Sequence, residues 1–129
     1  MTEELCILIL FSMIFLHVVE DFHLQGILAQ MKQKKYWADK PKKYKYDYIA
    51  ALIAHSFSWS FMIMIPIYIL SFKFNINITS AFIVNMLNCT MHFIVDDLKA
   101  NKLKINLIQD QSIHLIQILI TWLILIVPE

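Results

Sequence analysis

The stretch LCILILFSMIFLHVVEDFHLQ, residues 5–25, joins a long apolar run to a compact group of charged and imidazole side chains. The apolar run, residues 5–19, covers fifteen positions. A helix needs about 20 residues to cross the hydrocarbon core of a bilayer. A crossing helix therefore carries Glu20, Asp21 and His23 at or near membrane depth, where these side chains must face protein or water.

The rest of the chain shares this apolar character. Of its 129 residues, 59% are hydrophobic and only one is Gly, and the mean hydropathy is +0.61. Such a composition argues against a disordered, collagenous or turn-rich β architecture. We predict an all-α, polytopic membrane protein with a single domain, residues 1–129, and four transmembrane helices in an antiparallel bundle. The expected helices cover about residues 5–30, 48–70, 78–99 and 105–127.

Lysines indicate how these helices are oriented. The first loop, residues 31–47, holds seven lysines, the third holds Lys99, Lys102 and Lys104, and the second has only Lys73. Positively charged loops stay on the cytoplasmic side of a membrane. We therefore expect loops one and three in the cytoplasm and both termini outside, with the chain integral to the cytoplasmic (inner) membrane.

The first loop also interleaves its lysines with Tyr and Trp, a combination that fits an anionic-lipid or nucleic-acid patch. An ordinary topology signal with an aromatic belt explains it more simply. The net charge of +1 supplies no broad cationic face, so no nucleic-acid partner is expected. The expected partners are the lipid bilayer and an anionic lipid or phosphorylated substrate, and oligomerisation stays open.

Three pairs of His and Asp stand four residues apart, a spacing that places both members of a pair on one helix face. With a rise of about 1.5 Å per residue, the pairs and His55 fall in one layer near the cytoplasmic ends of their helices. Helical bundles hold metals in this way. The paired residues are His17 and Asp21, His92 and Asp96, and Asp110 and His114.

Several ionisable groups buried in hydrocarbon must neutralise one another, and a divalent cation does this well. Imidazole with carboxylate suits Zn²⁺, Mn²⁺ or Fe²⁺, whereas Cys6 and Cys89 lack the paired spacing of a Cys-type zinc site. Glu20 and His23 are left outside the metal set. One or two ions are expected, with the following as metal ligands or as groups around them: His17, Asp21, His55, His92, Asp96, Asp110 and His114.

The same pattern has a structural interpretation. His and Asp on adjacent helix turns also form hydrogen bonds with each other, and polar residues inside membranes often join helices together. The number of pairs and their common depth favour a metal site, but each pair alone fits either interpretation.

Four successive strings cover nearly the whole chain: His17-x-x-x-Asp21-Phe22-x-Leu24-Gln25 with Ala29 and Lys32, then His55, then His92-x-x-x-Asp96-x-x-Lys99, then Asp110-Gln111-x-x-His114. In these strings the sequence resembles a family of short integral-membrane proteins of unknown function that is common in phages and bacteria. It is also similar to the inner-membrane metal-dependent hydrolases, which carry comparable motifs on membrane helices. That second resemblance implies hydrolysis of a phosphoester or related lipid-like bond.

Our first hypothesis is therefore a membrane-embedded metal-dependent hydrolase acting on a phosphoester or lipid-like substrate near the cytoplasmic leaflet. Asp21 or Asp110 acts as general base, and Lys32 and Lys99 bind an anionic head group. Gln25 and Gln111 orient ligands or substrate. The alternative is a non-enzymatic, phage-type membrane effector or accessory protein whose His/Asp layer is structural. An ion transporter is disfavoured because the groups share one depth.

Overall fold

The computed structural model describes residues 1–126, which are helical with connecting turns and contain no strand. The all-α prediction is therefore confirmed for this part of the chain. Four helical segments are long and apolar enough to cross a membrane: Glu3–Leu24, Lys42–Ser71, Ile78–Ala100 and Leu107–Leu125. The elements are α1 (Glu3–Val18), η1 (Val19–Leu24), α2 (Leu28–Met31), η2 (Lys34–Trp37), η3 (Lys42–Tyr44), α3 (Asp47–Ser71), α4 (Ile78–Ala100) and α5 (Leu107–Leu125).

The first segment differs from the single helix expected over residues 5–30. α1 gives way to a π-helical turn, η1, which contains Glu20, Asp21 and His23, and the chain then bends at Gly26 before α2. Gly26 has φ +51°, a conformation that only glycine adopts readily. The Gln25 side chain donates to the backbone oxygen of Asp21 at 2.8 Å. The wide turn thus occurs where the polar group interrupts the apolar run.

The other helices lie close to the expected ranges. α3 and α4 extend the predicted 48–70 and 78–99 by one residue at most at each end. α5 begins two residues after the predicted start because Asn106 caps it, in a capping box with Gln109 that satisfies backbone N–H groups at the helix start. The predicted end of this helix, residue 127, lies outside the described residues.

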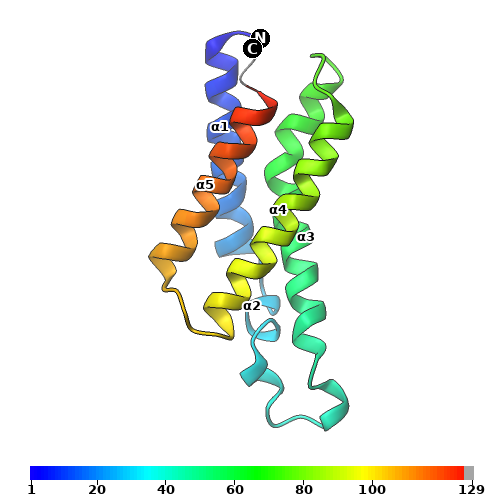
Figure 1. Cartoon of the computed structure of the whole chain (residues 1–129), viewed down its shortest axis with the longest axis vertical. Helices are drawn as coiled ribbons and strands as arrows, with labels where there is room; N and C mark the ends of the chain where they lie inside the picture. Colours follow the sequence, from blue (N-terminus) through cyan, green and yellow to red (C-terminus); the bar gives the residue numbers. More distant parts are fainter. Residues whose placement is uncertain (127–129) are drawn as a thin grey trace.

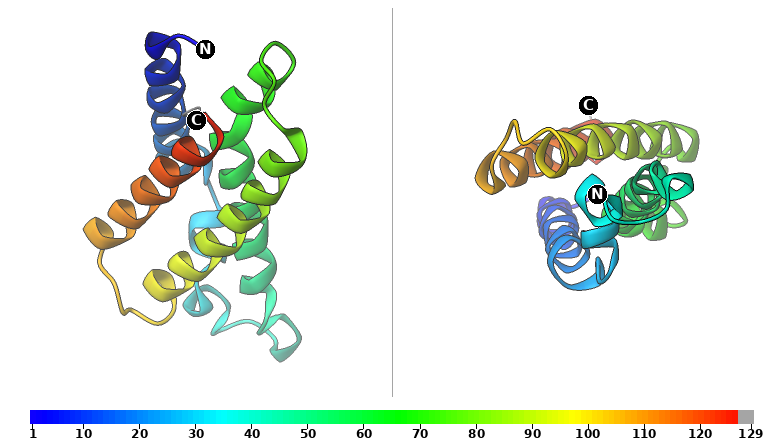
Figure 2. Two further views of the ribbon diagram at one scale, coloured as in Figure 1. Left: turned by 45° about the horizontal axis from the view of Figure 1, so that its top comes forward. Right: turned by 90° about the horizontal axis from the view of Figure 1, so that it is seen from below.

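Each long helix packs mainly against two others, in the order α1, α3, α4, α5 and back to α1. Seen from below, α4 and α5 form one layer and α1 and α3 the other (Figure 2). The N-terminus, the turn between α3 and α4 and the end of α5 lie at one end of the molecule (Figure 1). The chain between α2 and α3 and the connection between α4 and α5 lie toward the opposite end, here called the loop end.

Burial is distributed unlike that of a water-soluble domain. Large apolar side chains such as Phe11, Phe15, Phe82 and Ile120 are about half exposed or more, whereas the interior holds many polar groups. In water, a surface of this kind would be costly, because contiguous apolar patches are rare on soluble monomers. The apolar core consists of residues such as Met13, Trp59, Ile63, Met64, Ile67 and Ile118, which come mostly from the parts of α1, α3 and α5 nearer the end with the termini. The loop end holds the polar interior.

Candidate metal centre

Titratable side chains from η1, α3, α4 and α5 meet inside the loop half of the molecule. The π-turn supplies two carboxylates, α3 supplies one histidine, and α4 and α5 supply one His–Asp pair each. All of them are at most 4% exposed: Glu20, Asp21 (by side chain), His55, His92, Asp96, Asp110 and His114. These seven residues are called the His/Asp cluster below.

Three overlapping groups within this cluster can hold a metal ion, since the ligand atoms of each group lie within 4.8 Å of one another. The groups are Asp21 with His55 and His92; His92 with Asp96 and His114; and Asp21 with Asp110 and His114. Six of the seven predicted metal residues are thereby brought together, because only His17 belongs to none of the groups. Shared members such as His92, His114 and Asp21 make the arrangement suitable for one ion or for two neighbouring ions.

His55 lies at the centre of the first group. Its Nε2 lies 3.3 Å from Oδ1 of Asp21, 3.4 Å from Oδ2 of Asp96 and 3.1 Å from Nε2 of His92. Two imidazole nitrogens facing each other so closely leave room for one proton between them, or for a cation that both can bind.

His114 connects α5 with the rest of the cluster. Its Nε2 lies 3.4 Å from Oδ1 of Asp110 and 3.9 Å from Oδ1 of Asp96, and its Nδ1 lies 3.0 Å from the Gln117 side-chain oxygen. An N–H at Nδ1 donating to Gln117 leaves Nε2 as the nitrogen that can bind a metal. Such outer hydrogen bonds fix the ring orientation of metal-binding histidines.

Two lysines enter the cluster as counter-charges. Nζ of Lys32 lies 2.6 Å from Oδ2 of Asp96, and Nζ of Lys99 lies 2.6 Å from Oδ2 of Asp110. Lys32 is 8% exposed, so the first of these pairs is buried. Both lysines, which the sequence analysis predicts to bind an anionic head group, thus form ion pairs with candidate metal residues.

His17 lies beside the cluster with both ring nitrogens engaged. The indole N–H of Trp59 donates to its Nδ1 at 2.8 Å, and its Nε2 lies 3.1 Å from the side-chain oxygen of Gln111. Because an indole N–H can only donate, Nδ1 accepts and the proton of neutral His17 sits on Nε2. Gln111 in turn donates to Asp21 at 2.9 Å and to Asp110 at 3.0 Å. His17 thus orients the amide that holds these two carboxylates.

The sequence analysis does not predict that Trp59 and Glu20 contribute to the site. Trp59 is fully buried, and its ring stacks on that of His92 with centroids 4.1 Å apart, while Glu20 Oε1 lies 3.9 Å from Nδ1 of His55. A tryptophan in an apolar segment has no feature in the sequence that indicates such a role. Glu20 does have one: a residue three positions after His17 lies only about 60° from it around a regular helix.

Several buried polar atoms of the cluster lack a hydrogen-bond partner among the described residues. They are Nδ1 of His55, Nδ1 of His92, Nε2 of His114 and Oδ1 of Asp110. Buried polar groups without partners are rare in native proteins and call for an explanation such as an ion or water. Nε2 of His114 and Oδ1 of Asp110 face each other and are nitrogen and oxygen donors of the kind that Zn²⁺, Mn²⁺ and Fe²⁺ bind, so these residues fit a divalent metal.

A cavity of about 630 Å³ opens beside the cluster. Asp21 and Asp96 belong both to the cluster and to the cavity wall, whereas Asp110 does not line it. Four lysines complete much of the wall: Lys32, Lys34, Lys35 and Lys99. Gln25 also lines this cavity, and its amide donates to Oδ1 of Asp21 at 3.1 Å. The wall therefore combines ammonium groups, which attract a negatively charged molecule, with two of the candidate metal residues.

Comparison with protein-family models, with curated proteins and with solved structures found no match. The site is therefore interpreted from its own chemistry: imidazole and carboxylate donors shielded from water, next to a cationic cavity.

Proposed function

We propose that this protein is a membrane-embedded, metal-dependent hydrolase of phosphoester or related lipid-like substrates. The observation that carries the proposal is the convergence of three histidines and three aspartates from η1, α3, α4 and α5 beside a lysine-lined cavity. Zn²⁺, Mn²⁺ or Fe²⁺ at this place would polarise the scissile group and activate a bound water.

The roles of individual residues follow from their positions. Of the two candidate bases, Asp21 is favoured, because it lines the cavity and Asp110 does not. Lys99 is partly exposed toward the cavity and is suited to bind a substrate phosphate, because the phosphate can draw its ammonium away from Asp110. Gln25 and Gln111 hold Asp21 in place through the hydrogen bonds described above.

The charges of the site support a cation. Four carboxylates, Glu20, Asp21, Asp96 and Asp110, face two ammonium groups, those of Lys32 and Lys99. The excess of two negative charges has to be balanced by protons on the histidines or by a cation, and one divalent ion carries the matching charge. Such an excess inside a low-dielectric interior is costly without compensation.

We also propose how the protein lies in the membrane. The four apolar segments would cross the bilayer as an antiparallel bundle, with the lysine-rich loop end in the cytoplasm and both termini outside. Apolar side chains on the outside and polar ones inside support this arrangement. Membership of the short integral-membrane family that the sequence resembles is part of the same proposal.

A second candidate function is a non-enzymatic membrane protein whose cluster only joins the helices. The observation in its favour is that Lys32 and Lys99 already pair with Asp96 and Asp110 at 2.6 Å. These ion pairs neutralise half of the carboxylates without any metal.

Metal content separates the two functions. Protein purified in a mild detergent without chelator should contain at least one equivalent of Zn, Mn or Fe by elemental analysis, and His92→Ala and Asp96→Ala should lose it. His23→Ala is the matched control, because His23 is exposed and belongs to none of the three groups. Release of phosphate or alcohol from phosphoester lipids should then depend on the ion. Metal-free wild-type protein that also fails to bind added Zn²⁺ or Mn²⁺ would favour the structural candidate.

A further inference from the structure

The chain between α2 and α3 is folded, although the sequence suggested only a basic loop. It contains the short helices η2 and η3, and the Trp37 indole N–H donates to the backbone oxygen of Met31 at 2.7 Å. Lys40 places its ammonium 3.7 Å from the ring centroid of Tyr36 and 4.6 Å from that of Trp37. These contacts give the segment a defined shape, so its lysines are held in particular positions.

A cavity of about 450 Å³ lies within this segment and is separate from the one beside the His/Asp cluster. Its wall consists of Lys34, Trp37, Ala38, Lys40, Lys42, Lys45, Tyr46 and Tyr48. Four of these residues are lysines and none is acidic. Within residues 1–126, none of the four lysines forms an ion pair with a carboxylate. Several ammonium groups gathered without a counter-charge repel one another, and an anion between them relieves that repulsion.

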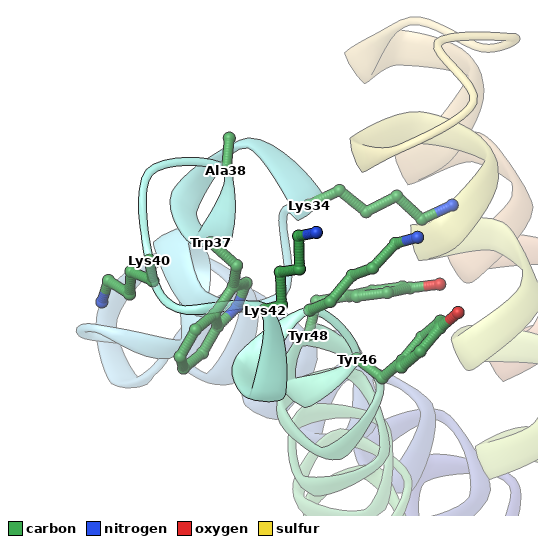
Figure 3. Close-up of a pocket in the computed structure, with 8 residues that line it drawn as sticks. Lys34, Trp37, Ala38, Lys40, Lys42, Tyr46 and Tyr48 are labelled. Carbon is green, nitrogen blue, oxygen red and sulfur yellow. The ribbon is translucent and has the colours of Figure 1, made fainter.

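Figure 3 shows how the polar ends are arranged. Lys34, Tyr46 and Tyr48 extend in the same direction, so an ammonium group and two phenol hydroxyls lie on one side, while Lys40 lies on the far side of Trp37. The Lys34 ammonium lies 5.0 Å from the centroid of the Tyr48 ring. Ammonium and hydroxyl donors set side by side match the several acceptor oxygens of a phosphate group.

The position of the cavity selects among phosphate-bearing molecules. The apolar segment that contains α3 begins at Lys42, so the cavity sits where that segment would leave the hydrocarbon region. Tyr and Trp concentrate at this level of a membrane, and basic residues there attract anionic lipids. Lys34 also lines the cavity beside the His/Asp cluster, so a group bound here lies next to that cavity.

We propose that this cavity binds the phosphate group of an anionic phospholipid headgroup. The site is distinct from the His/Asp cluster and requires no catalysis. Phosphatidylglycerol has a charged phosphodiester, which the lysines can bind, and acyl chains, which keep it at the membrane interface. Binding should weaken as salt rises, because ammonium–phosphate attraction at an exposed site is screened.

The test uses full-length protein in neutral detergent, titrated with phosphatidylglycerol and, separately, phosphatidylcholine, with bound lipid counted by native mass spectrometry. Wild-type protein should retain phosphatidylglycerol preferentially. Lys42→Gln/Lys45→Gln should weaken that binding by about 25-fold, or about five-fold for each lysine near an anionic headgroup. Lys73→Gln/Lys104→Gln is the matched control with the same net charge, and it should bind as wild type does. Lys42 and Lys45 do not line the cavity beside the cluster, so metal content should stay unchanged.

Three outcomes would overturn the proposal. The first is equal retention of phosphatidylglycerol and phosphatidylcholine, or an equal loss of phosphatidylglycerol binding in the two double variants. An equal loss would mean that binding depends only on the overall charge of the protein. The second is inorganic phosphate displacing the lipid at similar concentration, which would assign the cavity to a free anion. The third is a short single-stranded oligonucleotide binding more tightly than the lipid in a manner that depends on Lys42 and Lys45.

Discussion

The ammonium nitrogen of Lys32 lies 2.6 Å from Oδ2 of Asp96, although 64 residues separate the two in the sequence. Asp96 belongs to a group that can hold a metal ion, so the carboxylate that pairs with Lys32, at the end of α2, is also a candidate metal ligand. An ammonium group and a metal ion compete for that carboxylate. The strength of the competition can be measured.

Lys32→Met should destabilise the metal-free protein and increase its affinity for metal. Removing one partner of a buried ion pair leaves an uncompensated charge, which costs about 3 kcal/mol. Added Mn²⁺ or Zn²⁺ should restore most of the lost stability, because the ion takes the place of the ammonium. Thermal unfolding in detergent, with chelator and then with metal, measures both effects.

The matched control for this variant is Lys102→Met. Lys102 pairs with Asp97 at 2.9 Å but is 49% exposed by its side chain, so its loss should cost less than about 1 kcal/mol and should not respond to metal. Equal destabilisation by the two variants, with no metal response in Lys32→Met, would contradict the proposed competition.

His17→Ala should retain the bound metal, whereas His114→Ala should lose it. The structure engages both ring nitrogens of His17 with Trp59 and Gln111, but leaves Nε2 of His114 without a hydrogen-bond partner among the described residues. Elemental analysis of both variants, each checked for folding by circular dichroism, shows which of the two histidines is needed to bind the metal. If His17→Ala loses the metal as completely as His114→Ala does, His17 binds it directly, as the sequence pattern predicts.

The contrast between His17 and His114 shows which parts of the candidate site can be predicted from the sequence. The spacing of His92 and Asp96, and of Asp110 and His114, placed each pair on one face of a regular helix, and the structure brings these four residues together. His17 and Asp21 have the same spacing and also lie close together, with Nδ1 of His17 3.9 Å from Oδ2 of Asp21, but Trp59 and Gln111 engage the two nitrogens of His17. The spacing of residues does not predict this difference, because it depends on hydrogen bonds from side chains of α3 and α5.

Other contacts escape sequence reasoning for a different reason. The lysine side chains are long, so Lys32 and Lys99 can reach either a substrate or a neighbouring carboxylate, and the spacing of residues does not distinguish these cases. The role of Trp59 depends on its N–H meeting a histidine from another helix. The helix ranges were more predictable, because apolar runs and polar connections set them along the chain itself.

Glu20→Gln should weaken metal binding by about 10-fold, the lower end of the range for residues that support a metal-binding histidine, because Glu20 acts on His55 through its charge and not through a hydrogen bond. Glu20 Oε1 lies 3.9 Å from Nδ1 of His55, and a carboxylate there favours the tautomer whose Nε2 faces the metal group. Competition with a fluorescent zinc chelator measures the change in affinity. Glu4→Gln, at the exposed start of α1, is the control and should leave it unchanged. Unaltered affinity in Glu20→Gln would remove Glu20 from the site.

Single-cysteine variants should show that the two ends of α3 lie on opposite sides of the membrane. In a background with Cys6→Ser and Cys89→Ser, Lys43→Cys probes the segment before α3 and Asn75→Cys the turn after it; both positions are exposed. A membrane-impermeant maleimide applied to intact spheroplasts should label Asn75→Cys at once and Lys43→Cys only after permeabilisation. We expect this result because residues 31–47 hold seven lysines, which favour the cytoplasmic side, whereas the turn after α3 holds only Lys73. Labelling of both positions from outside would mean that α3 does not cross the bilayer, and a reversed pattern would place the metal cluster and the basic cavity near the outer leaflet.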